Sequence, residues 1–219
     1  MALPTFLDMV NDVLIRLREP PVGAVNENIL SKVIGKFIND AKRQVEDAYN
    51  WNSLSTTLTA NTTAGIFNYS LVGTQSRFKV IEIYNKTGRC YLSSKGSREM
   101  TQLFLGSDVP PQGIPNYYNF NGLSSAGDTQ VDLYPVPDKT YEIYFNLYIP
   151  QPDLVVDADR MFVVREPVML LAYARALVER GEDGGLNSSE AYSMYKSSLA
   201  DAIAIEASRY PEEDIWNWV

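Results

Sequence analysis

The sequence contains no histidine among its 219 residues and only one cysteine, Cys90. Without histidine, Ser-His-Asp and Cys-His nucleophiles, HExxH zinc sites and imidazole acid/base chemistry are all excluded. Only chemistry that uses carboxylates, lysine or tyrosine stays open. A single cysteine cannot form an internal disulfide, so we expect the chain to work in a reducing compartment.

Long apolar runs and clusters of basic residues are also missing. No apolar run approaches the ~18 residues that a membrane span needs, and the N-terminus lacks the basic start of a signal peptide. We therefore expect neither membrane association nor secretion. The net charge of −8 argues against a groove that grips nucleic-acid phosphates. It does not argue against a surface that DNA slides past without sticking.

The composition is 45% hydrophobic, which is ample for a folded core. The most regular pattern lies between Asn28 and Trp51, where apolar residues recur every three or four positions, as on one face of an α-helix. Gly35 costs this helix about 1 kcal/mol relative to alanine, so the helix depends on tertiary packing. Its apolar face consists of Leu30, Val33, Ile34, Phe37, Ile38, Ala41, Val45, Ala48 and Tyr49.

Helical patterns also occupy both ends of the chain. Thr5 and Asp8 predict a capping box at the start of a first helix, which Pro20 ends. Near the C-terminus, the almost wholly apolar run 168–178 predicts a helix in the centre of a bundle. Asn187 with Glu190 predicts a second capping box, which would open a last helix with the apolar face Ala191, Tyr195, Leu199, Ala202, Ile203 and Tyr210.

Between the helical ends, short alternating runs are separated by turn residues. Such runs predict an antiparallel sandwich or barrel, with one short helix at 97–105. The seven expected strands are 54–58, 66–71, 78–84, 89–92, 117–120, 129–134 and 141–149.

The sequence therefore predicts an α+β fold, in which a helical bundle formed by the N- and C-terminal helices carries an inserted antiparallel β-sandwich or barrel-like domain. We assign residues 1–52 and 160–210 to the bundle, 53–159 to the β-rich insertion, and 211–219 to a C-terminal tail.

Two groups of acids are candidate sites. Asp153, Asp157 and Asp159 offer oxygens to a hard cation, but the glycine-centred loop and distal bidentate glutamate of a calcium site are missing, so we expect a solvated linker. A second group would suit the paired carboxylates of glycoside chemistry. Because its members flank glycines or the terminus, we expect them to solvate loops, and we assign no catalytic, cofactor-binding or metal-binding residue. They are Glu182, Asp183, Glu212, Glu213 and Asp214.

Six tyrosines in the β-region are candidates for stacking on sugars or on partner proteins. Alternating tyrosines in strands more often serve cross-strand packing, which is the interpretation we favour. They are Tyr117, Tyr118, Tyr134, Tyr141, Tyr144 and Tyr148.

The C-terminus ends in the residues IWNWV, preceded by three acids. Two tryptophans on a free end expose apolar area that soluble monomers avoid, and tryptophan is a typical interface anchor. The tail either folds back on its own bundle or docks into a partner or neighbouring subunit. The candidate partner-binding residues are Tyr210, Ile215, Trp216, Trp218 and Val219.

Five short segments, taken in order, resemble the head-to-tail adaptor proteins of short-tailed bacteriophages, a group that includes the tail tubular protein A type. The order and spacing of the segments carry the resemblance, which runs from Phe6 to about Tyr210. The segments are FLDMVNDVLIRLREPPV, INDAKRQVEDAYNW, GIPNYY, LYPVPDKTYEIYF and EPVMLLAYARALVE.

The resemblance implies a structural virion protein without enzymatic activity or cofactor. Twelve copies would form a ring under the portal protein, with the helical part toward the portal and the β-part toward the tail nozzle or tail tube protein. This ring would extend the channel through which DNA passes without specific binding. Assembly would take place in the host cytoplasm and the final location would be the head–tail junction. The alternative is a carbohydrate- or receptor-binding β-module of a phage tail, with the tyrosines as its platform.

Overall fold

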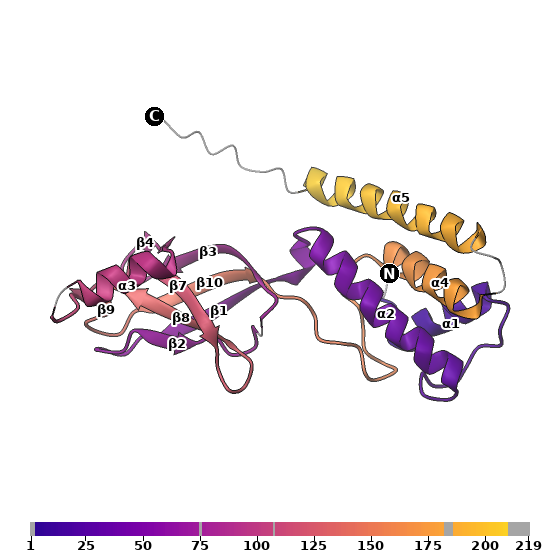
Figure 1. Ribbon diagram of the computed structural model, residues 1–219, viewed down its shortest axis with the longest axis horizontal. Helices are drawn as coiled ribbons and strands as arrows, with labels where there is room; N and C mark the ends of the chain where they lie inside the picture. Colours follow the sequence, from indigo (N-terminus) through magenta and orange to yellow (C-terminus); the bar gives the residue numbers. More distant parts are fainter. Residues whose placement is uncertain (1–2, 75, 107, 182–185, 210–219) are drawn as a thin grey trace. The chain divides into compact units, whose positions relative to one another are not determined.

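The computed structural model describes residues 3–74, 76–106, 108–181 and 186–209, and its helices precede and follow a long series of strands in the sequence (Figure 1). The prediction of an α+β fold with terminal helices flanking a β-region is confirmed. The described residues fall into two units. The helical unit takes those within Met1–Leu54 and Gln151–Val219, and the β-unit takes those within Ser55–Pro150.

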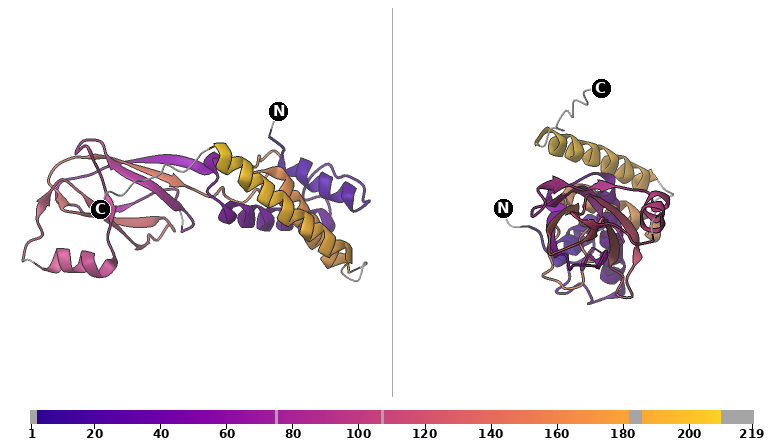
Figure 2. Two further views of the ribbon diagram at one scale, coloured as in Figure 1. Left: turned by 90° about the horizontal axis from the view of Figure 1, so that it is seen from above. Right: turned by 90° about the vertical axis from the view of Figure 1, so that its left-hand side faces the viewer.

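In the helical unit, α4 packs against each of the other three helices. Eight of its 16 residues are buried, which confirms the central helix predicted from the apolar run. Figure 2 shows α5 on the outside of this unit, where it lies along α4. The helices are α1 (Phe6–Arg16), α2 (Ile29–Ala48), α4 (Arg165–Arg180) and α5 (Leu186–Arg209).

The predicted capping box at the first helix is confirmed. The Thr5 backbone N–H donates to the Asp8 carboxylate (3.0 Å), and the Asp8 N–H donates to the Thr5 hydroxyl (3.1 Å). These contacts satisfy two N–H groups that have no partner within the helix. Asn28 and Ser31 form the same reciprocal arrangement at the start of α2.

The predicted capping box of Asn187 and Glu190 is wrong. An N-cap residue lies outside the helix with extended backbone, whereas α5 begins at Leu186 and already contains Asn187. The rest of the predicted face is confirmed where the structure describes it. Ala191, Tyr195 and Ala202 are buried, and Leu199 and Ile203 pack against the same core.

Gly35 marks a close approach between α2 and the segments before it. A Cβ atom at this position would lie 3.1 Å from both the Phe6 ring and a Val25 methyl group. Alanine, although the better helix former, would therefore press against two buried side chains. Glycine at this position lowers the intrinsic stability of the helix but allows α2 to pack closely against Phe6 and Val25.

The main part of the β-unit is formed by two four-stranded sheets that share one core, as in a sandwich (Figure 1). Ile83 and Phe145 of the first sheet meet Val131 and Leu133 of the second in this core. The first sheet has the order β1 (Ser55–Asn61), β10 (Glu142–Tyr148), β3 (Lys79–Asn85), β4 (Cys90–Tyr91), and the second β2 (Asn68–Ser70), β8 (Thr129–Tyr134), β7 (Tyr117–Leu123), β5 (Ser93–Ser94).

All seven predicted strands are present, and their mutual ladders are antiparallel. The predicted helix at 97–105 is α3 (Ser97–Leu105). The structure adds three strands of two residues, which are too short to show alternation, and two parallel pairings, β5 with β7 and β6 with β9. The added strands are β5, β6 (Gln112–Gly113) and β9 (Val136–Pro137).

After the β-unit, the chain returns along α2 through residues 151–164, here called the return segment. The Lys42 ammonium donates to the carbonyls of Gln151 (2.5 Å) and Pro152 (3.1 Å) and pairs with Glu46 (3.2 Å). The Glu46 carboxylate in turn accepts the Gln151 N–H (3.2 Å). Both charged side chains are completely buried, so the start of the return segment is bound by an ion pair inside the protein.

Further along the return segment, backbone groups form hydrogen bonds with α2 and with the start of α1. The Asn39 amide donates to the Leu154 carbonyl (3.0 Å) and accepts the Leu154 N–H (2.8 Å). The Phe6 N–H donates to the Asp159 carbonyl (2.8 Å), so the segment also bonds to the start of α1. These contacts join parts of the chain that lie more than a hundred residues apart.

We predict that Lys42→Met strongly destabilises the helical unit. The variant keeps the apolar stem but leaves the Glu46 carboxylate buried without its cation, which costs about 3–5 kcal/mol in comparable pairs. Urea unfolding followed by helical circular dichroism measures this change. Lys32→Met, at an exposed position of the same helix, is the matched control, and equal unfolding midpoints for both variants would contradict the prediction.

Candidate docking surfaces

The three acids of the return segment do not converge on one point. Asp153 pairs with Arg43, Asp157 accepts the Val25 N–H (3.0 Å), and the Asp159 carboxylate accepts two N–H groups of its own turn (2.7 and 2.8 Å). The segment is largely exposed, as expected of a solvated linker, and each carboxylate has in addition a structural partner. Within the described ranges, no group of three His, Cys, Asp or Glu side chains could hold a metal ion.

These contacts lower the pKa of two of the carboxyl groups. Hydrogen bonds from the Val155 and Val156 N–H groups hold the pKa of Asp159 below its usual value. The hydrogen bond from the Arg43 guanidinium does the same for the pKa of Asp153. Both groups therefore favour the folded helical unit in their ionised form.

Two sets of candidate residues lie outside the described residues. The first is the second acidic group, Glu182, Asp183, Glu212, Glu213 and Asp214. The second is the partner-binding set, Tyr210, Ile215, Trp216, Trp218 and Val219.

The six candidate tyrosines do not share one surface. Tyr141 is buried, its hydroxyl donates to Asp138 (2.6 Å), and burial raises its pKa to about 12. Tyr118 packs against the core of the β-unit. Tyr117 and Tyr134 line a hollow of about 590 Å³ beside α3. The remaining two, Tyr144 and Tyr148, belong to β10 in the other sheet.

A row of tyrosines nevertheless crosses the first sheet. Cross-strand pairing places Tyr144 directly opposite Tyr84, and Tyr84 directly opposite Tyr91, so the three side chains lie on one face. The rings of Tyr84 and Tyr91 are 4.9 Å apart, and Tyr91 is 64% exposed. Tyr84 and Tyr91 were not among the tyrosines predicted from sequence, because only the strand register brings them beside Tyr144.

One edge of this row carries a hydrogen-bonded group of charges. The Lys86 ammonium donates to the Tyr144 hydroxyl (3.0 Å) and pairs with Glu142 (2.8 Å), while the Tyr144 hydroxyl donates to Glu142 (2.7 Å). The hydrogen bond from Lys86 is the main cause that lowers the pKa of Glu142. The arrangement orients Tyr144 on the outer face of the sheet.

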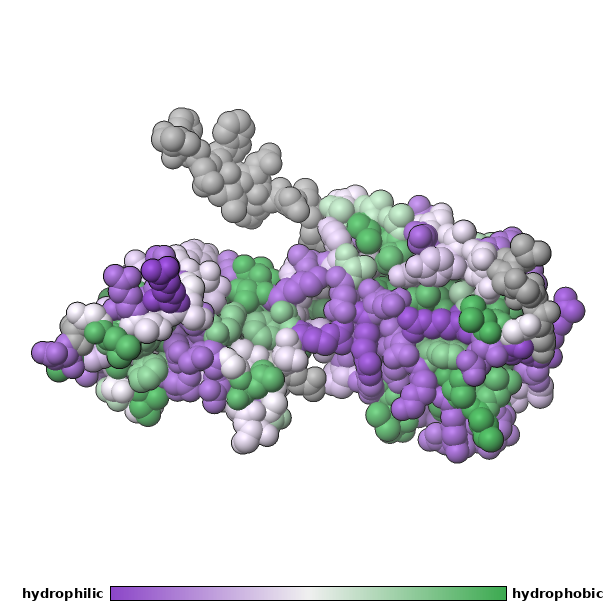
Figure 3. Space-filling view, in the orientation of Figure 1, coloured by the Kyte–Doolittle hydropathy of each residue, from purple (hydrophilic) through white to green (hydrophobic). Residues whose placement is uncertain are grey.

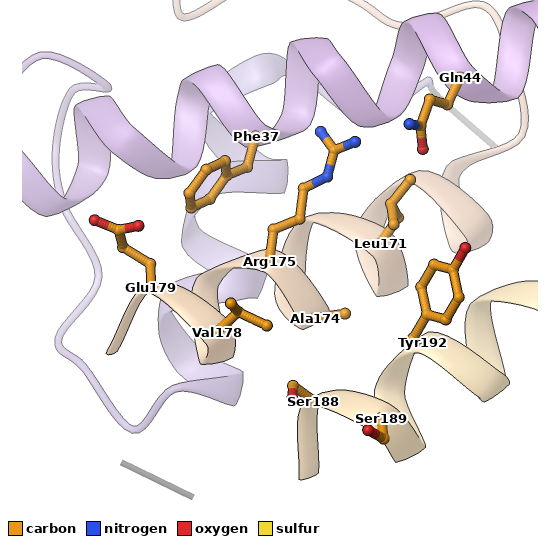
Figure 4. A pocket seen from close by; sticks show the side chains of 10 residues that line it. All are labelled: Phe37, Gln44, Leu171, Ala174, Arg175, Val178, Glu179, Ser188, Ser189 and Tyr192. Carbon is orange, nitrogen blue, oxygen red and sulfur yellow. The ribbon is translucent and has the colours of Figure 1, made fainter. Parts of the chain in front are cut away.

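The helical unit has an open groove between α2, α4 and α5 (Figure 4). Its volume is about 510 Å³. Phe37 enters from α2, Leu171 and Val178 from α4, and Tyr192 from α5. Arg175 stands beside Phe37 and pairs with Asp40 at 3.6 Å. The groove is thus apolar with a charged rim, which suits an apolar side chain of a partner.

Several apolar residues of α4 and α5 are exposed to solvent. Val178 is 67% exposed and Met194 and Ile205 of α5 are each 55% exposed. Figure 3 shows hydrophobic residues scattered among hydrophilic ones over the visible surface. Scattered apolar residues of this kind are normal on a protein surface, so the groove is the apolar feature that suits a partner.

Residues 4–214 match the family described as SU10 adaptor protein, so the chain belongs to that family. A comparison with curated proteins finds no match. The family is one of structural phage adaptor proteins, which act at the head–tail junction of the virion, and membership implies interaction with portal and tail proteins. A structural role is consistent with a protein that is not an enzyme. In the described part of the chain, no helix is long and apolar enough to cross a membrane.

We predict that Asp159→Asn makes the stability of the helical unit less sensitive to acid. The folded-state pKa of Asp159 is depressed, so its contribution is complete above the unfolded value of about 3.9. It is lost as the pH falls through the folded pKa. The asparagine variant lacks this contribution, and its stability should change less between pH 5 and pH 3, as measured by thermal unfolding. Asp201→Asn, on the exposed side of α5, should keep the wild-type slope.

Proposed function

We propose that the protein is a head-to-tail adaptor of a short-tailed phage, of the tail tubular protein A type. Copies form a ring, of twelve subunits by analogy with the resembled group, under the portal, which extends the DNA channel and provides the platform for tail attachment. The observation that carries this proposal is the open apolar surface of α4 and α5, because family membership calls for contacts with other proteins.

A ring requires two different contact surfaces on each subunit. Contacts between unlike surfaces close into a ring when the rotation between copies allows it, whereas contacts between identical surfaces stop at two copies. Apart from the contacts between copies, the groove of the helical unit and the tyrosine row of the β-unit are two unlike surfaces that suit two different partners. We propose that the helical bundle faces the portal and the β-rich insertion faces the tail nozzle or tail tube protein, each as a separate domain.

The proposal also gives the C-terminal tail, residues 211–219, a role in binding. Tyr210, Ile215, Trp216, Trp218 and Val219 would bind the portal or a neighbouring subunit, with the preceding acids keeping the free subunit in solution. Tryptophan supports this role since it is enriched among the residues that dominate binding energy. The rival carbohydrate- or receptor-binding module receives less support, because its six tyrosines are divided between a core, a hollow and an outer face.

We predict that deletion of residues 215–219 leaves the fold intact and weakens ring or portal association. A tryptophan that acts as an interface hot spot contributes about 2 kcal/mol or more, which is about thirtyfold or more in affinity. Native mass spectrometry with and without the portal protein measures assembly, and thermal unfolding checks the fold. Unchanged assembly would retire the role of the tail.

We predict that the protein does not retard double-stranded DNA in a mobility assay even at low salt. The net charge of −8 repels phosphates, and binding through phosphates strengthens as salt is removed. Retardation that disappears with added salt would reveal a basic surface and would contradict passage of DNA through the channel without binding.

A further inference from the structure

The β-unit leaves one long strand edge open. Within the described ranges, β1 pairs only with β10, and it stands at the end of its sheet. Its seven residues pair with β10 from Ser55–Tyr148 to Asn61–Glu142 without a register shift. The strands at three other sheet edges, β2, β4 and β5, have only two or three residues each.

Natural proteins usually protect such an edge with charges, prolines or bulges. β1 reads STTLTAN, with neither a charge nor a proline. By contrast β3, which pairs with β4 over only two residues, carries Lys79 and Glu82 and has a register shift in its ladder with β10. The open edge of β1 is therefore uncharged, regular and exposed, which is the description of a site for an added strand.

The hydrogen-bond pattern shows which groups this edge offers. The Thr62 N–H donates to the Tyr141 carbonyl (2.9 Å), so this pair bonds along the continuation of the β1–β10 ladder. Antiparallel ladders alternate between bonded and non-bonded pairs. The residues whose N–H and C=O groups point away from β10 are therefore Ser55, Thr57, Thr59 and Asn61.

The two faces of β1 differ in polarity. Leu58 and Ala60 are half-buried and pack against the β-unit core. Thr57 and Thr59 lie on the opposite face, where the Thr57 hydroxyl donates to Asn146 of β10 (2.6 Å). A strand that fits this edge needs apolar side chains on one face and a polar side chain opposite Thr57.

We propose that β1 takes up residues 215–219 of another copy of this chain as an added antiparallel strand. This inference rests on the proposed assembly of copies and names the surface that receives the tail. The segment reads IWNWV, and isoleucine, tryptophan and valine favour strands. With Asn217 opposite Thr57, its amide extends the polar row to Asn146. Trp216 then lies opposite Leu58, and both tryptophans join the apolar face.

Charge supports the antiparallel direction. In this register the acids before Ile215 run past Asn61 toward Thr62. There the Thr62 hydroxyl donates to the carbonyl of Lys139 (3.0 Å), whose ammonium stands over the Tyr141 ring. In the antiparallel direction, the acids before Ile215 therefore come near Lys139. In the parallel direction, they would instead lie beside Ser55.

A separate donor segment also suits a ring. Pairing of β1 with β1 of a second copy would join identical surfaces and stop at two copies. A tail that leaves one copy and adds to β1 of the next is a directional contact, which repeats until the ring closes.

The experiment compares Thr59→Pro with Thr59→Val in native mass spectrometry with the portal protein present. Proline removes an N–H that points away from β10, so it costs no bond of the existing sheet. Valine keeps that N–H and is the matched control. The expected result is loss of the ring with proline and a normal ring with valine, with thermal unfolding showing that both variants fold.

Disulfide trapping tests the register without relying on the proline variant. In a Cys90→Ser background, a Thr57→Cys chain lacking residues 215–219 is mixed with an Asn217→Cys chain. Bonded antiparallel partners have Cα atoms about 5.5 Å apart, within the range of a disulfide. We expect an interchain disulfide in assembled rings and less of it with Thr56→Cys, whose side chain lies on the other face.

The outcomes separate this inference from the proposed function. Absence of rings from the wild-type protein with portal contradicts the proposed function itself. Rings that form with both Thr59 variants and without the disulfide contradict only the strand addition. If one chain that carries both cysteines forms the disulfide within itself, or if Thr57→Cys bonds to a cysteine introduced in the portal, the donor is not another copy and the inference is overturned.

Discussion

The buried pair of Lys42 and Glu46 is the contact on which the two-part organisation depends. It receives the chain at Gln151, where the β-unit ends and the helical unit resumes. A buried ion pair is weak support for stability, since desolvation offsets much of the attraction. Here the ammonium also donates to two backbone carbonyls at the start of the return segment. The pair therefore defines where the chain re-enters the helical unit.

The first and last long strands of the β-unit connect it to the helical unit. β1 begins directly after Leu54 and β10 ends shortly before Gln151, and the two are neighbours in one sheet along their full length. The chain thus enters and leaves the β-unit on adjacent strands. An insertion of this form can vary in its loops while the two joining strands stay paired, which suits a structural protein that presents different surfaces on its two units.

The periodicity of apolar residues in the sequence predicted the helices and the longer strands. Alternation identified the seven strands that have three or more residues or form a hairpin, and the apolar run identified α4 as the central helix. It could not show the two-residue strands, the tyrosine row or the acceptor edge of β1, because these depend on register between distant segments. Nor could it show that Asp157 and Asp159 hold the return segment, since a carboxylate bonded to backbone and a solvated one look alike in a sequence.

The start of α1 bonds to the return segment through Phe6 and Asp159, and this has a consequence for how the protein is made. During synthesis the first helices leave the ribosome long before their partners, while the β-unit is continuous in the chain and has all its strands by residue 150. Domains generally fold as units as they emerge. We therefore expect the β-unit to complete its fold first. The N-terminal helices can complete theirs only after the last third of the polypeptide has been synthesised.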